Sequence, residues 1–175
     1  MTQPELPLTG ALCRLRAFDE RDDEALLRHA NDPAIGRNLR DRFPHPYDIE
    51  DAREWIALTR MDRPATNLAI DVDGEVCGSI GIAVGHDIER VSAEIGYWLG
   101  RSVWGRGIAT DALRLMTEYA FETFDLTRIW AVPFARNLAS HRVLEKAGYL
   151  REGLLRRAAI KDGEIVGMVM YARVR

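Results

Sequence analysis

The chain has 175 residues, of which 47% are hydrophobic, and a formal net charge of −3 at pH 7. This length and composition suit one domain over residues 1–175 with a single hydrophobic core. The weak negative charge gives no reason to expect nucleic acid as a partner, and the sequence shows neither a signal-like start nor an apolar run of membrane-spanning length. We therefore expect a cytoplasmic protein that binds neither nucleic acid nor a membrane.

The first part of the chain contains one strand signal and two helix signals. Residues 12–17 alternate as a strand does, and either Asp19 or Asp22 in the acidic cluster that follows can cap a short helix. Residues 31–33, Asn-Asp-Pro, end that helix. The stretch 48–51 has an aspartate at each end and resembles the cap of a second helix. A proline-rich loop is predicted between the two helices.

The rest of the chain predicts strands in hairpins together with two longer helices. Asp73 and Gly74 tolerate the left-handed conformation of a tight turn, so residues 67–84 form two strands joined there. The remaining elements follow in chain order: a strand at 92–99, a helix from Ala109 to Phe124, a strand at 128–134, a helix at 137–147 ending at Gly148, and strands at 149–155 and 164–174 around an Asp162-Gly163 turn. This pattern predicts a mixed α/β domain with antiparallel hairpins.

The stretch 99–110, LGRSVWGRGIAT, joins a strand to a helix through small residues. Gly105, Gly107 and Ala109 let a ligand approach the first helical N–H groups, which have no partner within the helix and lie at its positive end. A plain turn is the alternative. A Walker loop would need Gly-Lys-Ser/Thr at its end, and a dinucleotide fingerprint would need a third small residue at Thr110, so neither motif fits well.

Two blocks of the sequence resemble the GNAT acetyltransferases. WGRGIAT is similar to their pyrophosphate-binding segment, Gln/Arg-x-x-Gly-x-Gly/Ala, with Trp104 in place of the usual Gln or Arg. NLASHRVLEKAGY is similar to their later Asn-containing helix, and the order and separation of the blocks also fit. AEIGYWL and the serine of Asn-x-x-Ser resemble the RimJ/RimL group of ribosomal-protein N-terminal acetyltransferases. The resemblance covers nearly the whole chain.

The resemblance implies a GNAT fold, with a central, mostly antiparallel twisted sheet flanked by helices. It implies direct transfer of an acetyl group from acetyl-CoA to a primary amine, and it favours the N-terminal amine of a protein or peptide. A small-molecule amine acetyltransferase and a non-catalytic acyl-CoA-binding sensor are the alternatives, and a homodimer is left open. The residues expected to contact acetyl-CoA are Tyr97, Trp98, Leu99, Trp104, Gly105, Arg106, Gly107, Ile108, Ala109, Thr110, Asn137 and Ser140.

Glu94 is the candidate general base. An amine attacks a thioester only when it is neutral, so a proton acceptor is needed. Strand alternation places Glu94 on one face with Gly96 and Trp98, and the resemblance places a catalytic glutamate on this strand. We expect Glu94 to act directly or through water. A solvated strand glutamate is the alternative.

Ser140 is the candidate partner of the leaving sulfur. Helical spacing places Asn137, Ser140 and Leu144 on one stripe, which we expect to face the thioester. Many GNAT enzymes carry a proton-donating tyrosine where Leu144 stands, and leucine has no donor. The resemblance to the RimJ/RimL group implies that Ser140 hydrogen-bonds the sulfur instead. Asn137 as a plain helix cap and Ser140 as a small first-turn residue are the alternatives.

The cysteines and histidines give no metal motif. Cys13 and Cys77 are far apart and are expected to be reduced, buried and small, and the four histidines show no HxxH spacing. We predict that no metal is bound. His45, Phe43 and Trp55 could border an acceptor, or could simply be loop and core residues.

Overall fold

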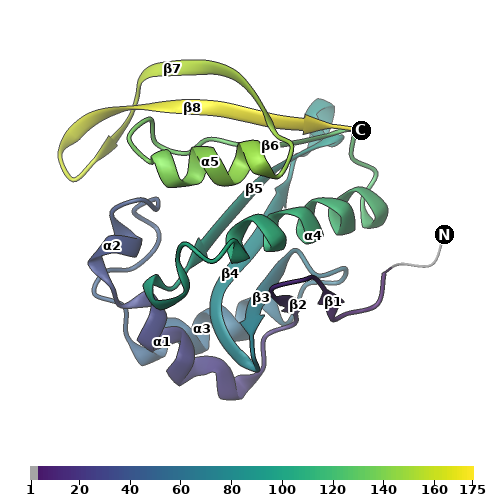
Figure 1. Ribbon diagram of the computed structural model, residues 1–175, viewed down its shortest axis with the longest axis vertical. Helices are drawn as coiled ribbons and strands as arrows, with labels where there is room; N and C mark the ends of the chain where they lie inside the picture. Colours follow the sequence, from purple (N-terminus) through teal and green to yellow (C-terminus); the bar gives the residue numbers. More distant parts are fainter. Residues whose placement is uncertain (1–3) are drawn as a thin grey trace.

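A computed structural model describes residues 4–175, and its strands form one mixed sheet in the order β1-β2-β3-β4-β5-β6-β8-β7 (Figure 1). The strands are β1 (Leu8–Thr9), β2 (Arg14–Arg16), β3 (Asn67–Val72), β4 (Glu75–Val84), β5 (Ser92–Leu99), β6 (Arg128–Ala131), β7 (Leu150–Lys161) and β8 (Glu164–Val174). All neighbouring strands are antiparallel except β5 and β6. The predicted mixed α/β class is confirmed.

Helices cover both faces of the sheet. They are α1 (Asp23–Ala30), α2 (Pro33–Gly36), α3 (Ile49–Thr59), α4 (Ile108–Thr123) and α5 (Leu138–Lys146). The larger hydrophobic cluster joins α4 and α5 to the sheet, and the smaller one joins α1 and α3 to it. In Figure 1, α4 crosses the middle strands, and α5 lies next to the long hairpin of β7 and β8. No described helix has the length and apolar character needed to cross a bilayer.

Local capping signals place the early helices where the sequence predicts them. The Asp48 carboxylate accepts hydrogen bonds from the amides of Glu50 and Asp51, and the Asp51 carboxylate accepts one from the amide of Asp48. Asp19 and Asp22 form the same reciprocal arrangement ahead of α1. Each cap satisfies helix N–H groups that would otherwise lack a partner. Both predictions of capping aspartates are therefore confirmed.

The main differences from the prediction concern four elements. Strand β1 and the one-turn helix α2 were not predicted, β6 ends at Ala131 instead of Phe134, and β7 continues to Lys161 instead of ending near Leu155. Asp32 caps α2, and Pro33 occupies its first turn. The Asn-Asp-Pro stretch therefore ends one helix and starts another, because proline is well tolerated at a helix start.

Candidate functional site

The site is built where β5 and β6 separate. These parallel strands pair only at Ser92, Ala93 and Glu94, which face residues 128–130. Beyond Glu94, the edge of β5 that faces β6 has no strand partner among the described residues. An unpaired strand edge offers backbone donors and acceptors to an extended ligand. The parallel pairing thus fixes Glu94 at the inner end of an open backbone edge.

The two faces of β5 present different side chains. Ala93, Ile95 and Leu99 are buried in the cluster that contains α4, whereas Trp98 packs with the cluster of α1 and α3. Alternation therefore places Glu94 on the face of α1 and α3. The predicted alternation of this strand is confirmed.

Glu94 is half-buried and forms an ion pair with Arg40, which lies between α2 and α3. Its carboxylate side chain is 24% exposed, so a small molecule or water can reach it. Next to it on the same face, Gly96 is exposed, and a Cβ at this position would meet no atom within 4 Å. The structure thus leaves open space beside Glu94.

Tyr97 and Ser140 meet on the opposite face. The Tyr97 Oη and Ser140 Oγ atoms lie 2.8 Å apart, which joins β5 to the first turn of α5. Burial raises the pKa of the Tyr97 phenol, although the hydrogen bond to Ser140 acts in the opposite direction. The phenol is therefore protonated at neutral pH and can donate to the serine oxygen.

Asn137 caps α5, and Leu144 belongs to the core. The Asn137 Oδ1 atom accepts a hydrogen bond of 3.2 Å from the Ser140 amide, so the capping interpretation is confirmed. The Asn137 amide nitrogen makes no hydrogen bond to the described residues. Leu144 is fully buried, and the stripe that it shares with Ser140 faces the interior. Leu144 has no hydroxyl group, but Tyr97 brings a phenol to the same helix from β5.

The loop before α4 is shaped by two glycines with positive φ. Gly105 has φ +73° and Gly107 has φ +82°, a region that other residues adopt only with strain. Gly107 is the N-cap of α4 and offers no capping side chain, and the amides of residues 105–109 make no hydrogen bond to the described residues. These donors point to an anion site at the positive end of a 16-residue helix.

Trp104 braces this loop. Its indole Nε1 donates a 2.6 Å hydrogen bond to the carbonyl of Leu99, which ties the two ends of the loop together. Among the other residues predicted to contact acetyl-CoA, the side chains of Leu99 and Ile108 are buried, and Trp98 packs edge-on to Phe43. The predicted contact of Leu99 and Ile108 with acetyl-CoA can therefore involve only their backbone, and the Trp98 side chain lies on the face of α1 and α3.

Sequence reasoning missed the segment 37–41, which three cations join to the rest of the molecule. Arg40 reaches Glu94, Arg136 donates a 3.0 Å hydrogen bond to the carbonyl of Arg37, and the Lys161 Nζ atom lies 2.8 Å from Asp41 Oδ1. We call Arg40, Arg136 and Lys161 the cationic frame. The run RNLRDR signalled a charged loop but not its contacts, which join residues 54 to 120 positions apart.

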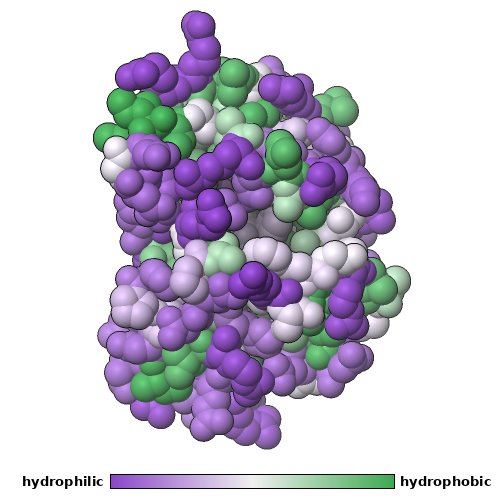
Figure 2. All heavy atoms as spheres, turned by 60° about the vertical axis from the view of Figure 1, so that its left-hand side comes forward, coloured by the Kyte–Doolittle hydropathy of each residue, from purple (hydrophilic) through white to green (hydrophobic). Residues whose placement is uncertain are grey.

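Figure 2 brings the side of the molecule that carries α2 forward and shows a hollow at about half height, with hydrophilic side chains above and below it. His45 is exposed in the loop between α2 and α3, whereas Phe43 stacks on Tyr47 at 5.3 Å and Trp55 packs against the smaller cluster. The core interpretation therefore describes Phe43 and Trp55.

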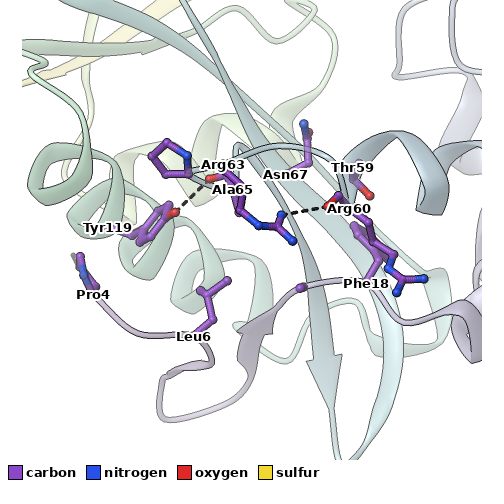
Figure 3. A pocket seen from close by; sticks show the side chains of 11 residues that line it. Pro4, Leu6, Phe18, Thr59, Arg60, Arg63, Ala65, Asn67 and Tyr119 are labelled. Carbon is purple, nitrogen blue, oxygen red and sulfur yellow. Dashed lines mark hydrogen bonds between the residues drawn. The ribbon is translucent and has the colours of Figure 1, made fainter.

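A separate pocket of about 490 Å³ lies near the start of β3 (Figure 3). Phe18, Arg60, Arg63 and Tyr119 are among its lining residues, and the Tyr119 hydroxyl donates to the Ala65 carbonyl across it. None of the predicted site residues lines this pocket. The pocket therefore lies apart from the candidate site.

The cysteines are free and buried, as predicted. Burial, reinforced by Asp111, raises the pKa of the Cys13 thiol to about 12. Cys77 comes together with His29 and Glu75, with one ligand atom from each lying within 4.8 Å of the others. Sequence spacing did not indicate this cluster. Arg28 also forms an ion pair with Glu75, and the charge of this guanidinium disfavours a metal ion at the cluster. That the protein binds no metal stays a prediction.

Comparisons with known proteins identify the family of this chain. A family model described as an acetyltransferase (GNAT) domain matches residues 13–150. An uncharacterized N-acetyltransferase of Bacillus licheniformis is 29% identical over 166 residues, 92% of each chain. The L-amino acid N-acetyltransferase AaaT of Escherichia coli (strain K12) is 29% identical over 163 residues, 92% of this chain and 97% of AaaT.

Among solved structures, Mycobacterium smegmatis RimJ in complex with CoA-disulfide matches with a TM-score of 0.80 and 29% identity, covering 97% of this chain and 88% of RimJ. The RimJ/RimL resemblance read from the sequence is thus reflected in the fold. Because the family model spans most of the chain, the protein belongs to the GNAT acetyltransferase family and is an N-acetyltransferase of this type.

Proposed function

We propose that this enzyme transfers the acetyl group of acetyl-CoA directly to the N-terminal amine of a peptide or protein. The observation that carries the proposal is the placement of Glu94 and Ser140 on opposite faces of β5, just where this strand leaves β6. A proton acceptor for the amine and a donor for the sulfur then flank a single opening in the sheet.

The residues around this opening fit acetyl-CoA. The free amides of residues 105–109 can hold the pyrophosphate at the start of α4, with Arg106 at the rim. The unpaired edge of β5 after Glu94 can pair with the amide groups of the pantetheine arm, and the Asn137 amide nitrogen is free to contact the same arm.

The chemistry then needs no covalent enzyme intermediate. The amine nitrogen forms a bond to the acetyl carbon, the carbon–sulfur bond breaks, and the amine proton passes to Glu94, directly or through water. Ser140 donates a hydrogen bond to the departing thiolate. A free thiol has a pKa of about 8.5, so a thiolate is a tolerable leaving group near neutral pH.

The charge of the acceptor side supports a peptide over a polycation. The cationic frame brings three positive charges to the segment 37–41, against the carboxylates of Glu94 and Asp41. A polyamine or an amino-sugar antibiotic would meet repulsion there. The name of the relative AaaT favours a second candidate acceptor, a free amino acid, which is also compatible with this charge.

A screen of acceptors tests the proposal. Peptides with free N-termini, matched N-formyl peptides, amino acids and polyamines are incubated with acetyl-CoA, and thiol release and product mass are measured. We expect acetylation of peptides with a free N-terminus only, and a 10²- to 10⁴-fold lower kcat for Glu94→Gln, the range usual for a general base. Acetyl-CoA affinity should be unchanged in this variant. Thiol release without any acetylated peptide would refute the proposed acceptor.

A further inference from the structure

The cationic frame carries more positive charge than its protein contacts neutralise. Arg40 is paired with Glu94, and Lys161 with Asp41. Arg136 donates only to a backbone carbonyl and lies 5.5 Å from the centre of the Phe134 ring, with no carboxylate in salt-bridge range in the described part of the chain. The three cations of the frame are therefore matched by only two carboxylates, although the whole chain has a net charge of −3.

We propose that the acceptor supplies a carboxylate close to its primary amine, and that Arg40 binds this carboxylate while Glu94 receives the amine. The inference rests on the proposed function and deepens it by naming the class of acceptor. In a peptide, the carboxylate is the side chain of an aspartate or glutamate at the first or second position. In a free amino acid, it is the α-carboxylate.

The ion pair between Arg40 and Glu94 makes this class of acceptor favourable. An ammonium group that approaches Glu94 must displace the guanidinium or lie beside it, and like charges at a few ångströms repel each other. An acceptor that carries both charges replaces one ion pair with two, because its ammonium contacts Glu94 and its carboxylate contacts Arg40. The planar guanidinium suits a carboxylate partner in geometry as well as in charge.

Arg40 is free to change partners because it is not needed to hold its own segment. Arg136 and Lys161 already fix residues 37 and 41 on either side of it. The Arg40 side chain is also 50% exposed, so an incoming carboxylate can reach it. The open space over Gly96 lies next to Glu94 on the same face. The acceptor thus has both room beside Glu94 and an accessible cation in Arg40.

The arrangement also limits how far the carboxylate can be from the amine. Arg40 touches Glu94 directly, so both charges of the acceptor must lie within one side chain's reach of each other. An extended residue spans about 3.5 Å, which restricts the carboxylate to roughly the first two residues of a peptide. Acidic residues further along the chain should contribute little.

The experiment compares acceptors that differ only in this carboxylate. Three peptides begin with Ser-Asp, Ser-Asn and Ser-Lys and are otherwise identical, and free glutamate and glutamine form a second pair. We expect kcat/KM for the Ser-Asp peptide to exceed that for Ser-Asn by about 10-fold, with Ser-Lys lowest. Arg40→Gln should bring the Asp-to-Asn ratio close to one. The Asn peptide serves as an internal reference, because any change at Glu94 affects both peptides equally.

Arg42→Gln is the matched control, since Arg42 is exposed in the same segment and forms no ion pair with the described residues. In Arg42→Gln, the ratio of kcat/KM between the Ser-Asp and Ser-Asn peptides should stay at its wild-type value. Equal rates for the Asp and Asn peptides, or a ratio that falls equally in both variants, would overturn the inference while leaving the proposed function intact. Acetylation of free glutamate but of no peptide, lost in Arg40→Gln, would support the carboxylate and refute the peptide. Inactivity on every acceptor would refute both.

Discussion

The hydrogen bond between Tyr97 and Ser140 joins the strand that carries Glu94 to α5, the helix that the proposed function places at the sulfur. Because burial keeps the phenol protonated, its proton can occupy one lone pair of the serine oxygen. The hydroxyl proton of Ser140 is then directed elsewhere, and the sulfur is the partner that the proposed function supplies. A serine hydroxyl group that is held in one orientation is a better hydrogen-bond donor than one that rotates freely.

Ser140→Ala should therefore lower kcat by about 10- to 100-fold with little change in acetyl-CoA affinity, because sulfur is a weaker acceptor than the oxyanions for which larger losses are seen. Tyr97→Phe should lower kcat by about 3- to 10-fold, the value of one hydrogen bond. Steady-state kinetics of both variants and of the double variant measure the coupling. If Tyr97 acts through Ser140, the double variant matches Ser140→Ala alone. Additive losses would show that the two hydroxyls act independently.

The loop before α4 gives a second prediction at the scale of single residues. Arg106→Glu places a carboxylate beside the free amides of residues 105–109, where it repels a pyrophosphate and competes with it. We expect acetyl-CoA to bind about 10-fold more weakly, as measured by calorimetry. Arg90→Glu makes the same change in charge near the other end of β5 and should leave the affinity unchanged. If Arg106→Glu bound acetyl-CoA as tightly as the wild type does, this loop would not be the anion site.

Gly107 is a less clean probe of the same loop. Its φ of +82° is strained for any residue with a side chain, and an added Cβ would lie 3.2 Å from Leu12 Cδ1. Gly107→Val would therefore distort the loop as well as obstruct the ligand. A change of charge at the neighbouring residue separates these two effects.

Among the elements, α3 depends on a cap that lies at the end of the loop containing Arg40. Asp48→Ala removes the acceptor of two amide hydrogen bonds at the start of this helix and should lower the free energy of unfolding by about 1 kcal/mol. Urea denaturation measures the loss. Glu54→Ala, at an exposed interior position of the same helix, should stay within about 0.5 kcal/mol of the wild type. Equal losses in the two variants would mean that the cap is redundant with tertiary packing.

The elements that sequence could predict are those whose signals are local. The caps at Asp48 and Asp19 and the turn at Asp73 act within a few residues, and the structure contains all three. The end of β7 depends instead on pairing with β8, where Lys161 faces Glu164, and residues 156–161 do not alternate as a strand would. Long-range pairing therefore decided this boundary.

The same distinction applies to the site. Family motifs pointed to Glu94 and Ser140 one at a time, but the partners of these residues lie 54 and 43 positions away. No periodicity or spacing relates Arg40 to Glu94, since they meet only after α2 and its loop fold over the sheet. The site residues can be proposed from sequence, and their electrostatic partners cannot.

At the scale of the whole molecule, one network of ion pairs centred on the buried Asp71 stabilises the edge of the sheet. The Arg16 side chain binds both Asp22, at 2.8 Å and 2.9 Å, and Asp71, at 2.7 Å, while Arg14 reaches Asp71 at 3.2 Å. The amide of Gly74 adds a further hydrogen bond to Asp71. The network joins β2, β3 and the turn before α1, so its loss should affect global stability.

Burial alone would raise the pKa of Asp71, whose side chain is 3% exposed, but the hydrogen bonds from Arg16, Gly74 and Arg14 outweigh burial and lower this pKa. A carboxyl group with a lowered pKa in the folded state stabilises the protein fully above its unfolded pKa of about 3.9. This contribution is lost as the pH falls through that value toward the folded pKa. The wild type should therefore lose stability from about pH 5 downward.

Asp71→Asn should lower the free energy of unfolding by about 2–4 kcal/mol at pH 7, because it removes a buried charge and leaves the partly buried Arg16 and the exposed Arg14 short of a negative partner. The difference from the wild type should shrink steadily between pH 5 and pH 3, because the Asp71 carboxyl group of the unfolded wild type takes up a proton there while the folded one stays ionised, and the amide of the variant does not titrate. Urea denaturation at several pH values measures both. Glu152→Gln, which breaks the more exposed pair with Arg128, should cost no more than about 1 kcal/mol. A difference for Asp71→Asn that stays constant down to pH 3 would show that packing, and not the charge of Asp71, holds this edge of the sheet.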